Sequence, residues 1–153
     1  MHANFVVVGA LALSACAGAQ AIPPNWVGAG GGYDPGGSPR VTAWESLAIV
    51  VNEASQLYSY STYDVIPQRN AVPVTSARTG GAMVLRKFGG SVYLLGFATI
   101  GAATSNSATT GSFSGGGILL YRFKPGWTVE GAVRAVNGSA TSKVMEFGFG
   151  KTF

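Results

Sequence analysis

Bulky apolar residues alternate with small or polar residues along the last stretch of the chain, positions 143–153. Successive side chains of an extended strand point to opposite faces. One face therefore carries Met145, Phe147, Phe149 and Phe153. The other face carries Glu146, Gly148, Gly150 and Thr152. The pattern predicts a strand with one face toward apolar surroundings and the other toward polar ones.

Similar runs, bounded by Gly, Pro, Asn and Ser, recur through the chain and predict eight strands. We expect them at 25–33, 41–51, 55–65, 74–87, 91–102, 112–123, 127–136 and 141–153. Longer and shorter connections alternate between them, and Asn137-Gly138 is typical of a tight hairpin. An even number of such strands indicates an all-β, eight-stranded antiparallel up-and-down transmembrane β-barrel. Residues 41–56 also fit an amphipathic helix, with Trp44, Leu47, Ala48 and Val51 on one face.

A closing strand that is apolar on one side and ends on an aromatic residue resembles that of Gram-negative outer-membrane barrels. The chain is similar to the small eight-stranded outer-membrane β-barrel family over nearly all of its length after residue 21. This resemblance implies location in the cell outer membrane. It also implies recognition by the barrel-assembly machinery through Phe147, Phe149 and Phe153.

Composition agrees with a surface that meets lipid. Charged residues make up 10 % of the chain and hydrophobic residues 47 %, with a mean hydropathy of +0.29. Soluble domains carry about 25 % charged residues. The net charge of +4 is modest, and we expect membrane lipids as partners and no nucleic acid.

The first residues fit an export signal. An apolar stretch, Phe5 to Leu13, precedes an A-x-A site at Ala19-Gln20-Ala21. We therefore expect a signal peptide at 1–21 and the barrel domain at 22–153. Leu13-Ser14-Ala15-Cys16 also fits a lipidation site, so lipid attachment at Cys16 stays open.

Removal of the signal takes the chain's one cysteine and one histidine, Cys16 and His2. Some small barrels of this family are enzymes that act on lipid A with a histidine, a serine and an acid. Without a histidine no motif supplies a base for the serines, and no metal-ligand spacing is present. We expect no enzyme, no metal and no cofactor.

Two groups of residues are candidate sites. We expect inward charges that pair in a narrow lumen at Arg78, Arg86, Glu130, Arg134 and Glu146. We expect aromatic girdles at the two membrane surfaces from Trp26, Tyr33, Trp44, Tyr63, Phe88, Tyr93, Phe113, Tyr121, Phe123, Trp127 and Phe153. The tyrosines of the run 58–64 fit girdle or lumen positions, or a surface that stacks sugars or peptides.

An eight-stranded barrel is narrow enough to be filled by its own side chains. The function we expect is therefore structural or a surface interaction, with a plugged lumen. One alternative is a narrow solute channel. Another is a lipid-anchored periplasmic barrel that binds an apolar ligand, which requires the apolar strand faces to point inward.

Overall fold

The computed structural model describes residues 23–34, 40–68, 71–124, 126–137 and 141–153. The expected signal peptide, Cys16 and the Gly138 turn position lie outside these ranges. Eight strands are present: β1 (Trp26–Asp34), β2 (Arg40–Asn52), β3 (Leu57–Gln68), β4 (Ala71–Phe88), β5 (Val92–Ser105), β6 (Ala108–Lys124), β7 (Trp127–Asn137) and β8 (Thr141–Thr152). Over the same ranges, no helix has the length and apolarity needed to span a membrane.

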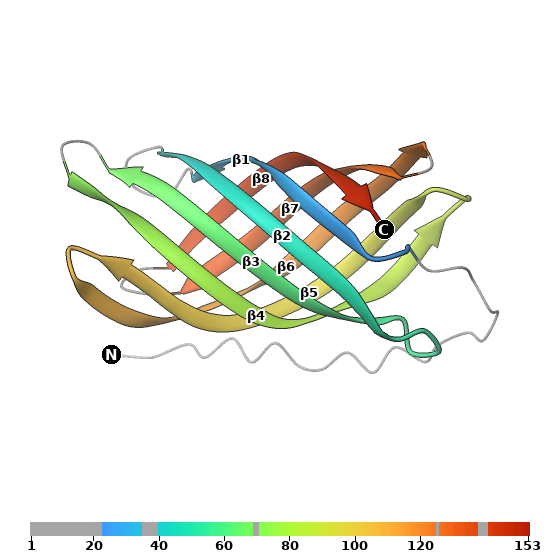
Figure 1. Cartoon of the computed structure of the whole chain (residues 1–153), viewed down its shortest axis with the longest axis horizontal. Helices are drawn as coiled ribbons and strands as arrows, with labels where there is room; N and C mark the ends of the chain where they lie inside the picture. Colours follow the sequence, from blue (N-terminus) through green and yellow to red (C-terminus); the bar gives the residue numbers. More distant parts are fainter. Residues whose placement is uncertain (1–22, 35–39, 69–70, 125, 138–140) are drawn as a thin grey trace.

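The strands form one closed antiparallel barrel in sequence order (Figure 1). Each strand pairs with the next, and β1 pairs with β8, so the sheet has no free edge. The expected up-and-down topology is confirmed. The segment 41–56 is strand β2 followed by a turn, not a helix.

The register shows how strongly the strands tilt. One row of neighbours starts on β7 and returns to β7 by way of every other strand: Trp127, Lys151, Val27, Leu47, Ser61, Thr79, Ile100, Phe113 and Asn137. The return is shifted 10 residues, from Trp127 to Asn137. A shift of this size in eight strands corresponds to a tilt near 40°, as in other small barrels.

The two ends of the barrel differ. We call the end that holds Trp26 and Phe153 the near end, and it also holds the turns at 53–56 and 89–91. The opposite end is the far end. There β5 and β6 are joined by Asn106 and Ser107 alone, both with positive φ (47° and 66°). This is the geometry of a tight two-residue hairpin.

Two expected loops are therefore wrong. The sequence predicted a polar loop at 103–111, but the strands continue to Ser105 and resume at Ala108. Pro67 and Pro73 were expected in a loop and instead lie in β3 and β4. They fall where the β3–β4 register shifts between Ile66 and Gln68. Proline, which cannot donate to the ladder, is tolerated at such an irregularity.

Side chains alternate between the lumen and the outside along each strand. Bulky apolar side chains cover the outside, which we call the outer wall, and include Phe147, Phe149, Met145, Val133 and Leu119. The buried cluster inside the barrel contains aromatic, aliphatic and small residues. The bulky apolar residues of the outer wall thus point away from the lumen, and a separate apolar cluster lies inside it.

Candidate functional site

The near half of the lumen is filled by a packed apolar cluster. Trp26 and Tyr58 meet edge to face with ring centroids 5.1 Å apart, and Tyr60 packs on Phe97 at 5.2 Å. The remaining members are Ala48, Ala82, Tyr93, Leu95, Ile118, Leu120 and Ala132. Aromatic pairs at these separations stabilise beyond their buried area. Side chains from seven strands thus pack together in the near half of the lumen.

The segment just before β1 is hydrogen-bonded to other residues at the near end. Tyr58 donates its hydroxyl hydrogen to the Pro23 carbonyl at 2.6 Å. The side-chain oxygen of Asn25 accepts a hydrogen bond from the Val50 amide at 2.7 Å. The backbone carbonyl of Asn25 accepts one from the Phe153 amide at 3.0 Å. Pro23 is buried. The start of the described chain is thus tied to β2, β3 and the last residue of the chain.

Glu130 lies at the boundary between the apolar cluster and a polar layer. Its carboxylate accepts hydrogen bonds from Trp26 Nε1 (3.2 Å), Ser46 Oγ (3.2 Å) and Tyr60 Oη (3.1 Å). The side chain is buried, and within the described part of the chain no ion pair involves it. Three donors from three strands therefore supply what water would supply to an exposed carboxylate.

The far half of the lumen holds an ion-pair cluster centred on Asp64. Arg78 and Arg134 each form an ion pair with Asp64, and Arg134 Nη2 also lies 2.5 Å from Glu146 Oε1. All four side chains are nearly or fully buried. Hydroxyl groups extend the cluster: Arg78 donates to Ser112 Oγ (2.8 Å) and Ser76 Oγ (2.7 Å). Charges removed from water persist only when paired and hydrogen-bonded in this way.

The structure brings four of the five expected lumen charges inside: Arg78, Glu130, Arg134 and Glu146. The prediction that Arg86 faces the lumen was wrong. The β4–β5 register shifts between Val84 and Arg86, and this bulge reverses the alternation along β4. Arg86 consequently lies exposed beside Phe88, with its guanidinium 5.3 Å from the ring centroid.

Asp64, the acid that joins the two arginines, was not among the expected lumen charges. Its signal was present in the run 58–64, where Tyr58, Tyr60, Thr62 and Asp64 share one strand face. The inward phase of Tyr58 and Tyr60 therefore also fixes Asp64 inside. Tyr58 and Tyr60 face the lumen, and Tyr63 faces outward. Tyr58 and Tyr60 are therefore not part of an outer surface that could stack sugars or peptides.

The girdle positions predicted for three aromatic residues were also wrong. Trp26, Trp44 and Tyr93 are buried in the lumen, with exposures of 0 %, 4 % and 2 %. The other expected girdle residues lie on the outer wall: Tyr33, Tyr63, Phe88, Phe113, Tyr121, Phe123, Trp127 and Phe153. The assembly-signal residues Phe147, Phe149 and Phe153 are also on the outer wall.

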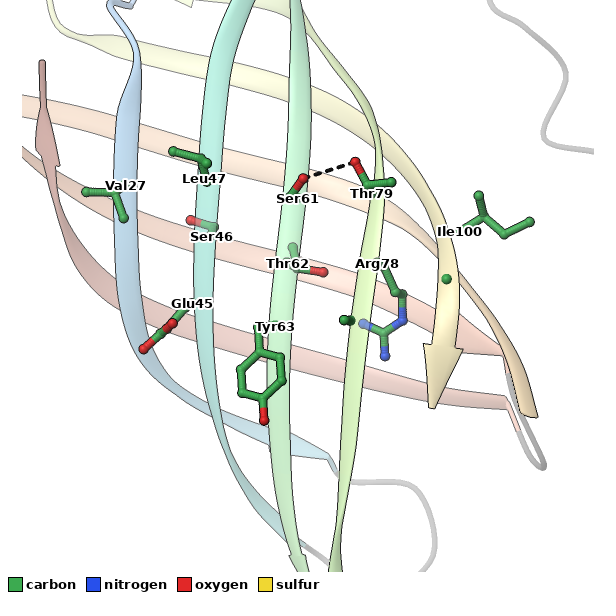
Figure 2. A pocket seen from close by; sticks show the side chains of 12 residues that line it. Val27, Glu45, Ser46, Leu47, Ser61, Thr62, Tyr63, Arg78, Thr79 and Ile100 are labelled. Atoms are coloured by element: carbon green, nitrogen blue, oxygen red, sulfur yellow. Dashed lines mark hydrogen bonds between the residues drawn. The ribbon is translucent and has the colours of Figure 1, made fainter. Parts of the chain in front are cut away.

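One part of the outer wall departs from the bulky apolar pattern. A hollow of about 450 Å³ lies over β2, β3 and β4. Figure 2 shows Val27, Leu47 and Ile100 around it, with the hydroxyls of Ser61 and Thr79 joined by a hydrogen bond of 3.0 Å. Glu45 and Tyr63 line its far side. Among the residues that the structure describes, no group of three or more His, Cys, Asp or Glu is placed to hold a metal.

Comparison with known proteins identifies solved structures that share this architecture. No family model and no curated protein matches the sequence. The N-terminal β-barrel domain of Pseudomonas aeruginosa OprF superposes with a TM-score of 0.68 at 12 % identity, covering 88 % of this chain and 100 % of that domain. Yersinia pestis Ail in a phospholipid nanodisc gives 0.57 at 12 % identity, covering 86 % and 99 %. A de novo designed transmembrane β-barrel gives 0.52 at 14 % identity, covering 86 % and 98 %.

This chain has the fold of the small eight-stranded outer-membrane barrels. In an outer-membrane barrel of this kind the apolar side chains of the outer wall face lipid and the lumen is polar or filled. The exposed phenylalanines and the buried Asp64 cluster follow the same division. Fold and outer wall together are those of a transmembrane β-barrel.

Proposed function

We propose that this outer-membrane barrel is a closed, non-catalytic structural element of the envelope. The observation that carries the proposal is the filling of the lumen by two successive layers. Side chains of the apolar cluster close the near half, and the Asp64 ion pairs cross the far half. A solute would have to displace both layers to pass.

One neighbour, Ail, is the attachment invasion locus protein of Yersinia pestis. In this chain the far-end connection between β5 and β6 consists of Asn106 and Ser107 only. So short a hairpin offers little surface to an external partner, which favours the structural role.

The same proposal includes assembly from the periplasm, with the near end on that side. Phe147, Phe149 and Phe153 are 64–67 % exposed on the outer wall, where the assembly machinery can reach them. The basic side chains Arg86 and Lys151 are exposed near this end and suit anionic headgroups.

Conductance in planar bilayers tests the closed lumen. We expect the purified protein to give no current steps above the lipid background. A variant that removes side chains of both layers (Tyr60→Ala and Phe97→Ala together with Asp64→Ser, Arg78→Ser and Arg134→Ser) should pass small ions, whereas Val133→Ala on the outer wall should not. Reproducible current steps from the unchanged protein would replace the structural proposal with a narrow channel.

A further inference from the structure

The hollow over β2, β3 and β4 has polar groups, among them Glu45, Ser61 and Thr79, on an outer wall that is mostly apolar. Using a rise of about 2.4 Å per tilted residue, Glu45 lies about 14 Å above the level of Trp127. The apolar band of such a barrel is about 25 Å tall, so this level is inside it. Glu45 is exposed, and no hydrogen bond or ion pair joins it to another described residue.

A carboxyl group facing hydrocarbon is costly unless it finds a partner. The neighbouring strand offers hydrogen-bond donors on the same wall, but they point elsewhere. Ser61 and Thr79 bond to each other, which uses one of their two hydroxyl hydrogens and leaves one to donate. Tyr63 is exposed toward the far end in Figure 2. The lining of this hollow therefore holds an unused acceptor and unused donors.

We propose that this face, from Glu45 to Thr79, is the contact between two copies of the chain in the membrane. A two-fold contact places this patch against the same patch of the second copy. An acceptor on one copy then faces a donor on the other. The Glu45 carboxyl of each copy then accepts from the hydroxyls of the other. A lipid tail fills the hollow but supplies neither donor nor acceptor, and lipid leaves both groups unsatisfied.

The shape of the wall agrees with this partner. Around the hollow, Val27, Leu47 and Ile100 form an apolar rim. The opposite wall, over β7 and β8, has the protruding side chains Val133, Phe147 and Phe149. Side chains that project from β7 and β8 keep backbones apart, whereas the hollow lets a second wall approach. The proposal rests on the barrel lying in the membrane and not on the lumen being closed.

Cysteine cross-linking in outer membranes tests the contact. Ala77→Cys lines the hollow, and Ala135→Cys is its matched control, since Ala135 is also an exposed alanine, at a similar depth on β7. With a short bis-maleimide we expect a product of twice the chain mass from Ala77→Cys and only background from Ala135→Cys. The unsubstituted chain, whose one cysteine is Cys16, defines that background.

A second substitution tests the chemistry. Glu45→Leu in the Ala77→Cys chain should lower the cross-linked fraction at least five-fold, while Glu45→Gln, which still accepts, should stay within two-fold. Retained heat-modifiability in SDS shows that each variant is folded. Equal cross-linking at Ala77 and Ala135, a product of any other mass, or a yield that Glu45→Leu leaves unchanged would each overturn the proposal.

Discussion

Asp64 on β3 and Arg134 on β7 form an ion pair across the lumen although their strands lie on opposite sides of the barrel. Arg78, on β4, binds the other oxygen of the same carboxylate. The contact thus spans the barrel and joins residues that are 70 positions apart in the sequence. The two buried guanidinium groups share Asp64, and Arg134 is also paired with Glu146.

Removing that acid should be costly. Asp64→Ala leaves Arg78 and Arg134 buried without their shared partner, and breaking a buried ion pair costs about 3–5 kcal/mol. We expect a loss of this size in the free energy of urea unfolding in phospholipid vesicles, followed by tryptophan fluorescence. Glu53→Ala, in the exposed turn at the near end, is the control and should change it by less than about 0.5 kcal/mol. Equal effects of the two substitutions would contradict the central role of Asp64.

Glu130 should behave differently, because its partners are neutral donors. Glu130→Leu leaves Trp26 Nε1, Ser46 and Tyr60 without an acceptor, and each unsatisfied buried group costs about 1–3 kcal/mol. Glu130→Gln keeps one carbonyl oxygen and should lose less stability than Glu130→Leu. The same unfolding measurement ranks the two variants. If Glu130→Leu were as stable as the unchanged protein, the three hydrogen bonds would contribute nothing net.

The alternation of side chains made most of the fold predictable, since a period of two identifies strands wherever one face is apolar. It predicted all eight strands and the inward phase of Arg78, Glu130, Arg134 and Glu146. The prediction failed for Arg86, because a bulge adds one residue and reverses the phase beyond it. A bulge depends on the neighbouring strand and leaves no mark in the local pattern.

Trp26, Trp44 and Tyr93 were misplaced for a different reason. Aromatic side chains suit both a girdle and a packed lumen, so their type does not decide the face. The face of Trp44 was harder still to predict, because its neighbour Glu45, a charged residue, faces outward. In each case the face is decided by contacts with other strands, such as the hydrogen bond from Trp44 Nε1 to the Gly31 carbonyl of β1 at 3.2 Å.

The position of Trp44 in turn depends on a glycine in β8. A Cβ at Gly148 would lie 2.4 Å from the Ala29 carbonyl oxygen and 2.7 Å from the Trp44 ring. Gly148→Ala should therefore weaken β1–β8 closure and lower the unfolding free energy by about 1–3 kcal/mol. Gly131→Ala is the matched control, because its Cβ would meet only the Phe147 ring at 3.6 Å. A shift in SDS heat-modifiability to lower temperature for Gly148→Ala alone is the expected result.

The outer wall gives the most direct test of where the barrel lies. Phe147 projects from β8 with 67 % of its surface exposed. In water, replacing an exposed phenylalanine by lysine changes stability little, whereas near the middle of a bilayer a lysine costs about 2–4 kcal/mol. Phe147→Lys should lower the unfolding free energy by that amount in vesicles, and Phe147→Leu should not. Since the substituted side chain touches the surroundings more than the protein, the cost reports on the surroundings. A lysine tolerated at this position would mean that the wall faces water, and the membrane assignment would fail with it.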